Sequence, residues 1–376
     1  MAQPIQTRLK LLFSRDGKDV TEDLGPDLLS FTYVDKETAE ADEVTITLKD
    51  PDGTWAGRWR PDGGEMVRAF IQSGDVEAAK RELYCGRFFV DSLRASGAPR
   101  TCEIKAVSIP MNTPIRRKPK TRAWEKKSLK AIAQSIAKAA KVDLLFDSEV
   151  NPTFDRVDQS AESDLKFLLK LCEETGLSLK LTDEKIVIFD QASYESKKPV
   201  ETIVLGESPV LSWDFESAQS ESYKSVTVNY RDPKTKKKSS AGKFDLNAKP
   251  SGELIDPGKF RLDGSAPAKT NKAVFSYTYT DPDADENGQE FVLKKRAKSA
   301  ADAKRLAKAK MRQLNLRRVT GSMTVIGDTR FVAGVVVAVE GFGSFDGNFV
   351  IEQADHSVSG SGYTTALSLR RVSVNY

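Results

Sequence analysis

The sequence predicts a mainly β protein with α/β insertions, on the basis of three observations. Short runs of alternating apolar and polar residues fill residues 1–110 and recur near the end of the chain, as half-buried antiparallel strands require. Apolar residues at helical spacing are confined to stretches near residues 128–140, 160–176 and 299–316. Turn signals rich in Gly, Asp and Pro separate the runs.

The composition is that of a soluble globular protein with more than one domain. The 376 residues include 39% hydrophobic and 30% charged residues, with a net charge of +4 that does not by itself indicate a nucleic-acid partner. No apolar run approaches the roughly 20 residues of a membrane span, and no secretory signal is expected. Cys85, Cys102 and Cys172 lack a metal-binding or redox spacing, so we expect reduced thiols that fill the core.

Residues 1–110 are expected to form a first β unit, an antiparallel barrel or sandwich. The clearest strand is Val44–Leu48, where apolar residues alternate with threonines before a turn at Asp50–Gly53. Similar runs occur at Leu9–Phe13, Phe31–Tyr33, Met66–Ile71, Tyr84–Leu93 and Cys102–Ile109.

Residues 111–198 are expected to form an α/β insertion. Ser128 is placed to cap one helix that runs to about residue 140, and Ser160 to cap a second that Gly176 ends. Two further apolar runs around an acidic turn predict a hairpin over 177–189.

Residues 199–231 are expected to supply the first strands of a second β unit, including Ser225–Tyr230. Residues 232–317 are expected to be a second insertion of long loops. They should contain one strand at Ala273–Tyr279 and a helix that Ser299 caps.

Residues 318–376 are expected to complete the second β unit. Four strands are predicted, at Ser322–Ile326, Phe331–Val339, Phe349–Ile351 and Tyr363–Arg370. The whole chain therefore has a duplicated plan, with one β unit, an insertion, and a second β unit that is itself split.

The single histidine, His356, argues against most enzyme classes. With one histidine, no Ser-His-Asp or Cys-His arrangement is indicated, and no His-rich zinc site is present. Its strand-like surroundings favour a hydrogen bond at a strand end over a role as general base. We therefore assign no catalytic, cofactor-binding or metal-binding residue, and we expect neither enzymatic activity nor a cofactor.

An acidic stretch, Asp281–Glu290, partly matches a calcium-binding loop. A calcium loop needs glycine at position 6 and glutamate at position 12, where this chain has Glu286 and Val292. A solvated acidic turn is the favoured interpretation.

Three basic tracts could contact phosphate groups. They are Arg116–Lys127, Lys234–Lys238, and a helix face with Lys304, Arg305, Lys308 and Arg312. Because 54 acidic residues nearly balance 58 basic ones, a polar protein interface is favoured over nucleic-acid binding.

Several motifs together resemble the late control gene D family of phages. The C-terminal motif consists of Gly327-Asp328, Phe331, Ala333-Gly334, Asp346-Gly347, Phe349, Ile351, His356, Gly362–Thr365, Leu367 and Leu369. Further matches lie at Gln159–Gly176 and, near the N-terminus, at Phe31–Asp35, Asp42–Leu48 and Trp55.

The resemblance implies the central hub of a contractile-tail baseplate, related to the base of type VI secretion spikes. It implies a homotrimer in which each chain supplies two similar tube-type antiparallel β-barrels, giving a pseudo-sixfold ring around a channel. The first barrel would be residues 1–110, and the second 199–231 with 318–376. Such a hub would adapt a threefold central spike to a sixfold tail tube in the virion baseplate, after assembly in the host cytoplasm.

The partners implied by the resemblance are the spike protein, the tail tube protein and baseplate wedge proteins, with the tape measure protein as a further candidate. No membrane partner is expected, and DNA would only pass through the channel. Two alternatives remain open. One is a baseplate-associated cell-wall hydrolase that uses a dispersed pair of carboxylates, which have no fixed sequence spacing. The other is a nucleic-acid-binding protein that uses the basic tracts.

Overall fold

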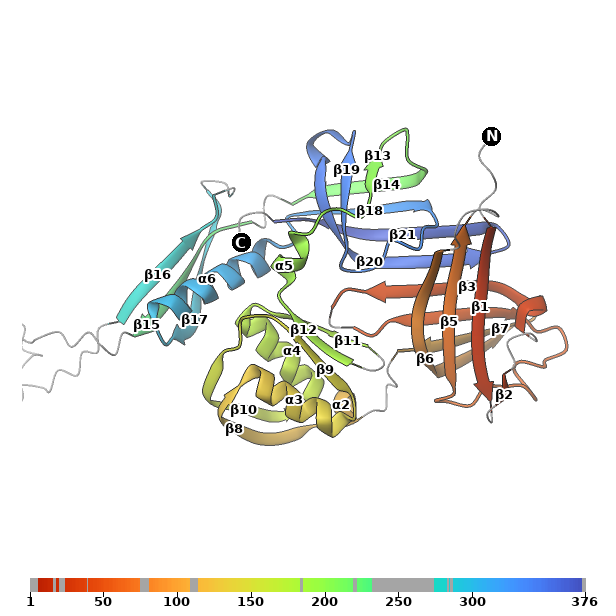
Figure 1. Cartoon of the computed structure of the whole chain (residues 1–376), viewed down its shortest axis with the longest axis horizontal. Helices are drawn as coiled ribbons and strands as arrows, with labels where there is room; N and C mark the ends of the chain where they lie inside the picture. Colours follow the sequence, from red (N-terminus) through yellow and green to blue (C-terminus); the bar gives the residue numbers. More distant parts are fainter. Residues whose placement is uncertain are drawn as a thin grey trace, which may run out of the picture.

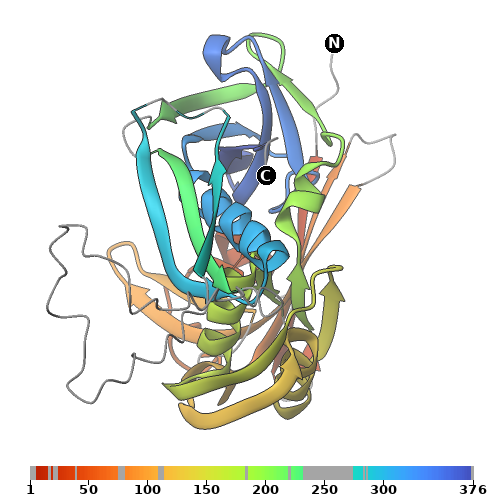
Figure 2. The same cartoon turned by 90° about the vertical axis from the view of Figure 1, so that its left-hand side faces the viewer.

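The computed structural model describes residues 6–15, 18–19, 24–38, 40–74, 81–108, 114–182, 185–218, 222–231, 274–282, 284 and 287–373. Over these residues the chain is mainly β, as predicted. Figures 1 and 2 show two β units next to each other, with two smaller α/β units packed beside them. None of the helices in these ranges is long and apolar enough to cross a membrane.

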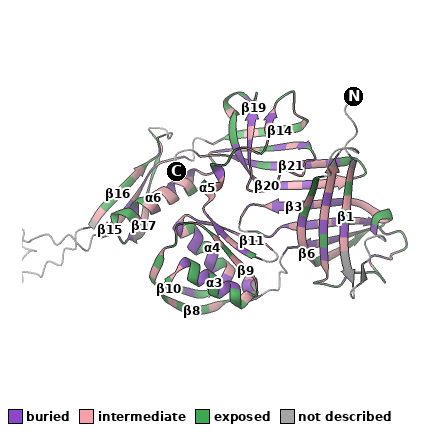
Figure 3. Cartoon of the chain, in the orientation of Figure 1, coloured by how far each residue is buried: buried purple, intermediate pink, exposed green. Residues whose placement is uncertain are grey.

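The first β unit agrees with the predicted strand runs. Its strands are β1 (Gln6–Arg15), β2 (Lys18–Asp19), β3 (Leu28–Lys36), β4 (Glu43–Lys49), β5 (Met66–Gly74), β6 (Arg81–Ser96) and β7 (Thr101–Val107), with a short 3-10 turn at Gly25–Asp27. Buried and partly exposed residues alternate along β3, β4 and β7, as Figure 3 shows. Phe31, Ile46, Phe88 and Ile104 are buried at the centre of this core.

The α/β insertion contains both predicted helices and the predicted hairpin. Its elements are α2 (Pro114–Arg117), β8 (Lys120–Ser128), α3 (Leu129–Ala140), β9 (Asp143–Asp147), β10 (Thr153–Glu162), α4 (Asp164–Thr175), β11 (Ser178–Leu181), β12 (Lys185–Phe189) and α5 (Gln191–Glu195). Ser128 caps α3, and Gly176 ends α4 with a φ of 78°.

The predicted cap of α4 was wrong by three residues. Ser160 lies in β10, which pairs with β8, and the cap is Ser163, whose hydroxyl accepts a hydrogen bond from the Lys166 amide. The strand pairing keeps the chain extended up to Glu162, so the helix can begin only after it.

A separate α/β unit forms from β15 (Tyr223–Arg231), β16 (Val274–Thr280), β17 (Gln289–Ala297) and α6 (Ala300–Asn315), which Ser299 caps as predicted. The expectation that 223–231 belongs to the second β unit is therefore wrong, because β15 pairs with β16 and β17. The expectation of loops over 289–297 is also wrong. The physical reason is the apolar stripe of α6, which covers Val226 and Val228 and gives these strands a core of their own.

The second β unit consists of β13 (Thr202–Val204), β14 (Val210–Ser217), β18 (Val319–Ile326), β19 (Val336–Glu340), β20 (Gly347–Ser359) and β21 (Gly362–Arg371), with a 3-10 turn at Gly343–Phe345. The predicted strand at Phe331–Val339 begins only at Val336. The residues before it form a turn in which Gly334 adopts a φ of 88° and donates to the Ile351 carbonyl.

The two β units repeat one strand order. In the first unit the paired neighbours run β3-β4-β7-β6-β5-β1, and in the second they run β14-β18-β21-β20-β19-β13. The pairs correspond in direction except at the end, where β1 and β5 are antiparallel and β13 and β19 parallel. Because β20 also pairs with β3, the two units share one sheet (Figure 1).

Candidate functional site at the junction of the two β units

The two β units are joined by a strand ladder. The first part of β20 pairs with β19, and its second part pairs with β3, from Gln353 opposite Lys36 to Ser359 opposite Ser30. Along its other edge, β20 pairs with β21. Backbone hydrogen bonds therefore fix how the second unit is oriented against the first.

His356 lies in the middle of this ladder, not at a strand end as expected. It is fully buried, and its ring stacks on Tyr33 and Tyr363 with centroids 5.8 and 5.9 Å away. Its Nδ1 is 2.7 Å from the Tyr363 hydroxyl. Burial lowers the pKa of His356 to about 4, so the ring is neutral at physiological pH and packs as part of the core.

One cluster of charges connects the insertion to both β units. Lys180 of β11 lies 2.7 Å from the buried Asp35 and 3.7 Å from the buried Asp42. The second oxygen of Asp35 accepts a 2.8 Å hydrogen bond from the Ala333 amide in the turn before β19. Burial raises the pKa of Asp42 to about 7, although Lys180 opposes the shift.

A second cluster is centred on Arg370 of β21, whose side chain is fully buried. Its guanidinium donates to Glu195 of α5 and, at 3.2 and 3.3 Å, to Glu37 after β3. Arg312 of α6 also donates to Glu195. Burial raises the pKa of Glu37, and Arg370 opposes that shift. Four units of the chain therefore meet at one ion-pair network.

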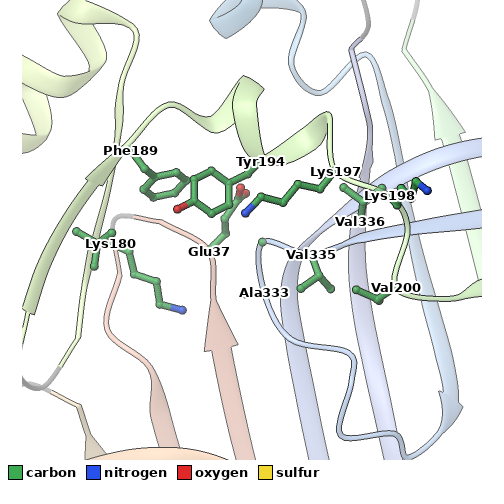
Figure 4. A pocket seen from close by; sticks show the side chains of 12 residues that line it. Glu37, Lys180, Phe189, Tyr194, Lys197, Lys198, Val200, Ala333, Val335 and Val336 are labelled. Carbon is green, nitrogen blue, oxygen red and sulfur yellow. The ribbon is translucent and has the colours of Figure 1, made fainter. Parts of the chain in front are cut away.

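A cavity of about 330 Å³ lies between the insertion and the second β unit. Figure 4 shows its apolar wall, formed by Phe189, Tyr194, Val200, Val335 and Val336. The polar side chains around it include Glu37, Lys180 and Lys197. The Lys197 ammonium lies 3.8 Å from the centre of the Tyr194 ring, whereas Glu37 and Lys180 belong to the two ion-pair clusters. The charges at this site thus serve to hold units together.

Several basic side chains of the predicted tracts form contacts within the chain. Lys120 and Arg122 of β8 bind the buried Asp164 at 2.5 and 2.6 Å. On α6, Arg305 donates to the Thr175 carbonyl at 2.7 Å, and Arg312 pairs with Glu195. The tract at 234–238 lies outside the described residues. These pairings weaken the case for a phosphate-binding surface.

The acidic stretch and the cysteines give no metal site in the part of the chain that the structure describes. Asp281 is buried and accepts a 2.8 Å hydrogen bond from Asn315, while Asp283, Asp285 and Glu286 lie outside the described residues. The three cysteines are buried and free of disulfides.

Sequence reasoning missed the ion-pair network altogether. Glu37 and Arg370 are 333 positions apart, and Glu195 comes from a third segment. The only local signal is the pair Arg370 and Arg371, two charged residues at the end of an otherwise uncharged strand.

Comparisons with known proteins agree with the predicted resemblance. The phage tail baseplate hub (GPD) family matches residues 115–362. The chain is 26% identical over 371 residues to the probable baseplate hub protein of Escherichia phage 186, covering 95% of this chain and 92% of that protein. It is also 26% identical over 366 residues to the probable baseplate hub protein of Escherichia phage P2, covering 94% and 91%.

A solved structure shares the fold. The 43 kDa tail protein of prophage MuSo2 from Shewanella oneidensis superposes with a TM-score of 0.67 at 14% identity, over 98% of this chain and 99% of that one. The family match covers well over half of the chain and includes nearly all of the insertion and most of the second β unit, with Lys180, Glu195 and Arg312 of the two charge clusters. The chain belongs to the phage tail baseplate hub family, and it is a structural component of the tail baseplate.

Proposed function

We propose that the chain assembles as a homotrimeric, non-enzymatic hub that adapts a threefold spike to a sixfold tail tube. The observation that carries this proposal is the repeated strand order of the two β units together with their junction through β20 and β3. Two equivalent units on each chain place six such units in a trimer, which supplies sixfold surroundings from threefold symmetry.

The shared sheet has the properties of a channel wall. Its two apolar cores lie on one face, and the other face carries mostly polar residues. Examples on three neighbouring strands are Thr32, Lys36, Thr45, Thr47, Glu103 and Lys105. Closing six units into a ring would direct this face toward the centre and remove the exposed sheet edges.

The partners of this hub would be the central spike protein on one side and the tail tube protein on the other. The two α/β units extend from the shared sheet (Figure 1), which suits them to contacts with wedge proteins. DNA would only pass through the channel. The internal pairing of Lys120, Arg122 and Arg312 supports this limited role for DNA.

The solution mass of the purified chain, alone and mixed with a candidate spike protein, tests the proposal. A mass of three chains, or a complex of three chains with three spike subunits, is expected. A monomer that binds neither the spike protein nor the tail tube protein would overturn the proposal. For the non-enzymatic part, incubation with peptidoglycan should release no fragments, and measurable release would contradict it.

A further inference from the structure

The shared sheet has open strand edges at β14 and in the second half of β6. β14 pairs with β18 along one edge only and stands at the end of the shared sheet. β6 pairs with β5 up to Phe89 and with β7 along its other edge, so residues 92–96 have one open edge. Unpaired edges of this kind are templates for pairing with another chain.

The second half of β6 corresponds to the part of β20 that pairs with β3. Val90 exchanges hydrogen bonds with Gly64 and Glu65, just as Ile351 does with Gly334 and Val335. Both glycines have positive φ, 91° and 88°. The ladder shifts by one residue directly afterwards in both strands, between 90 and 92 in β6 and between 351 and 353 in β20. Ser92 is thus the counterpart of Gln353.

β14 is in turn the counterpart of β3. In the order of paired strands, β3 comes first in the first β unit and β14 comes first in the second β unit. Each also has a register shift near its start, between Leu28 and Ser30 in β3 and between Val210 and Ser212 in β14. Aligning Ser212 with Ser30 makes Ala218 the counterpart of Lys36.

We propose that β6 of one copy pairs antiparallel with β14 of the next copy, in the register that β20 and β3 adopt within the chain. This inference rests on the proposed trimer and names its contact surface. Lys36 faces Gln353 in the chain, so Ala218 faces Ser92 between chains. The ladder then continues through Arg94 opposite Glu216 to Ser96 opposite Asp214.

The side chains support this register independently. Arg94 and Glu216 are both exposed and of opposite charge, and Arg94 already faces Glu103 on its other side. Ala95 is opposite the buried Cys102, and its new neighbour Phe215 packs on Phe349, so the core faces are continuous. A slip of one residue would place Arg94 beside an inward-facing position, which the pleat disfavours.

The occupant of both edges is a second copy of this chain. The contact is head-to-tail, since β6 and β14 are different surfaces, and such contacts close into a ring when the rotation allows. Each chain spans two of six equivalent positions, so three copies complete the ring. The edge strand also exposes Leu211 and Trp213, at 58% and 47%, which is unusual for residues that face only solvent.

Cysteine cross-linking of the full chain tests the register. Directly opposite residues have Cβ atoms about 4.5–5.5 Å apart, close enough for a disulfide. Oxidation of the double variant Arg94→Cys with Glu216→Cys should give covalent dimers and trimers. The matched control, Arg94→Cys with Ser217→Cys, has its second cysteine on the other face and should give none.

Charge reversal provides a second readout. Arg94→Glu should raise the concentration at which the assembly dissociates by at least about tenfold, and Arg94→Glu with Glu216→Arg should restore it. Thermal unfolding checks that each variant is folded, as expected for substitutions at exposed positions. A trimer that neither cross-links nor responds to charge reversal overturns this contact while leaving the trimer intact. A chain that remains monomeric overturns both the contact and the proposed function.

Discussion

Replacing Arg370 by methionine should destabilise the protein far more than the loss of one surface charge. The substitution keeps much of the side-chain volume but leaves Glu37 and Glu195, which are only 6% and 4% exposed, without their shared cation. Breaking a buried ion pair from one side costs about 3–5 kcal/mol. Because Arg312 still pairs with Glu195 and Gln191 with Glu37, we expect about 3 kcal/mol in the free energy of unfolding.

Urea unfolding followed by circular dichroism measures this loss. Adding Glu37→Gln to Arg370→Met removes the uncompensated carboxylate and should recover about 1–2 kcal/mol. The control is Arg156→Met, whose side chain is 61% exposed and pairs with Asp158 and Glu125 at the surface, and it should leave the urea midpoint of unfolding essentially unchanged. A cost below about 1 kcal/mol for Arg370→Met, or no recovery with Glu37→Gln, would refute the view that this network holds the units together.

Two further predictions concern the C-terminal strands. The pKa of His356 lies at about 4 in the folded chain and at 6.5 ordinarily, so the unfolded chain binds more protons between these values. Stability should therefore fall as pH drops from 6.5 to 4, by about 3 kcal/mol, and His356→Gln should remove this part of the slope, as unfolding at several pH values will show. An unchanged slope would contradict the neutral buried ring. Gly327→Ala would place a Cβ 2.1 Å from the Tyr363 ring and should cost at least about 2 kcal/mol in unfolding free energy, whereas Gly360→Ala, with open space around it, should be nearly neutral. Equal stability of these two variants would show that the strand end is not packed as described.

Local patterns predicted the elements well because their causes are local. The caps at Ser128 and Ser299 and the left-handed end at Gly176 depend only on residues within a few positions. The alternation in β3, β4 and β21 likewise reports which face is buried. Such patterns suffice for most of the secondary structure of both β units.

Strand partners and the junction site could not be predicted in the same way. Alternation in β15 shows a half-buried strand but does not say that α6, about 70 positions later, will cover it. The network around Arg370 is assembled from distant segments. Likewise, Lys180 donates a hydrogen bond to Asp35, which is 145 positions away in the sequence. A local sequence window contains no information about such pairs, whereas the family resemblance, which rests on ordered motifs along the chain, identified the hub.

Cryo-electron microscopy of the purified assembly would show directly whether the chain forms the proposed hub. We expect a particle of three chains in which six similar β units surround a central channel, with alternate units joined by β20–β3 pairing within a chain and by β6–β14 pairing between chains. A dimer, an open chain of copies, or a threefold particle whose β units do not form a six-membered ring would contradict it.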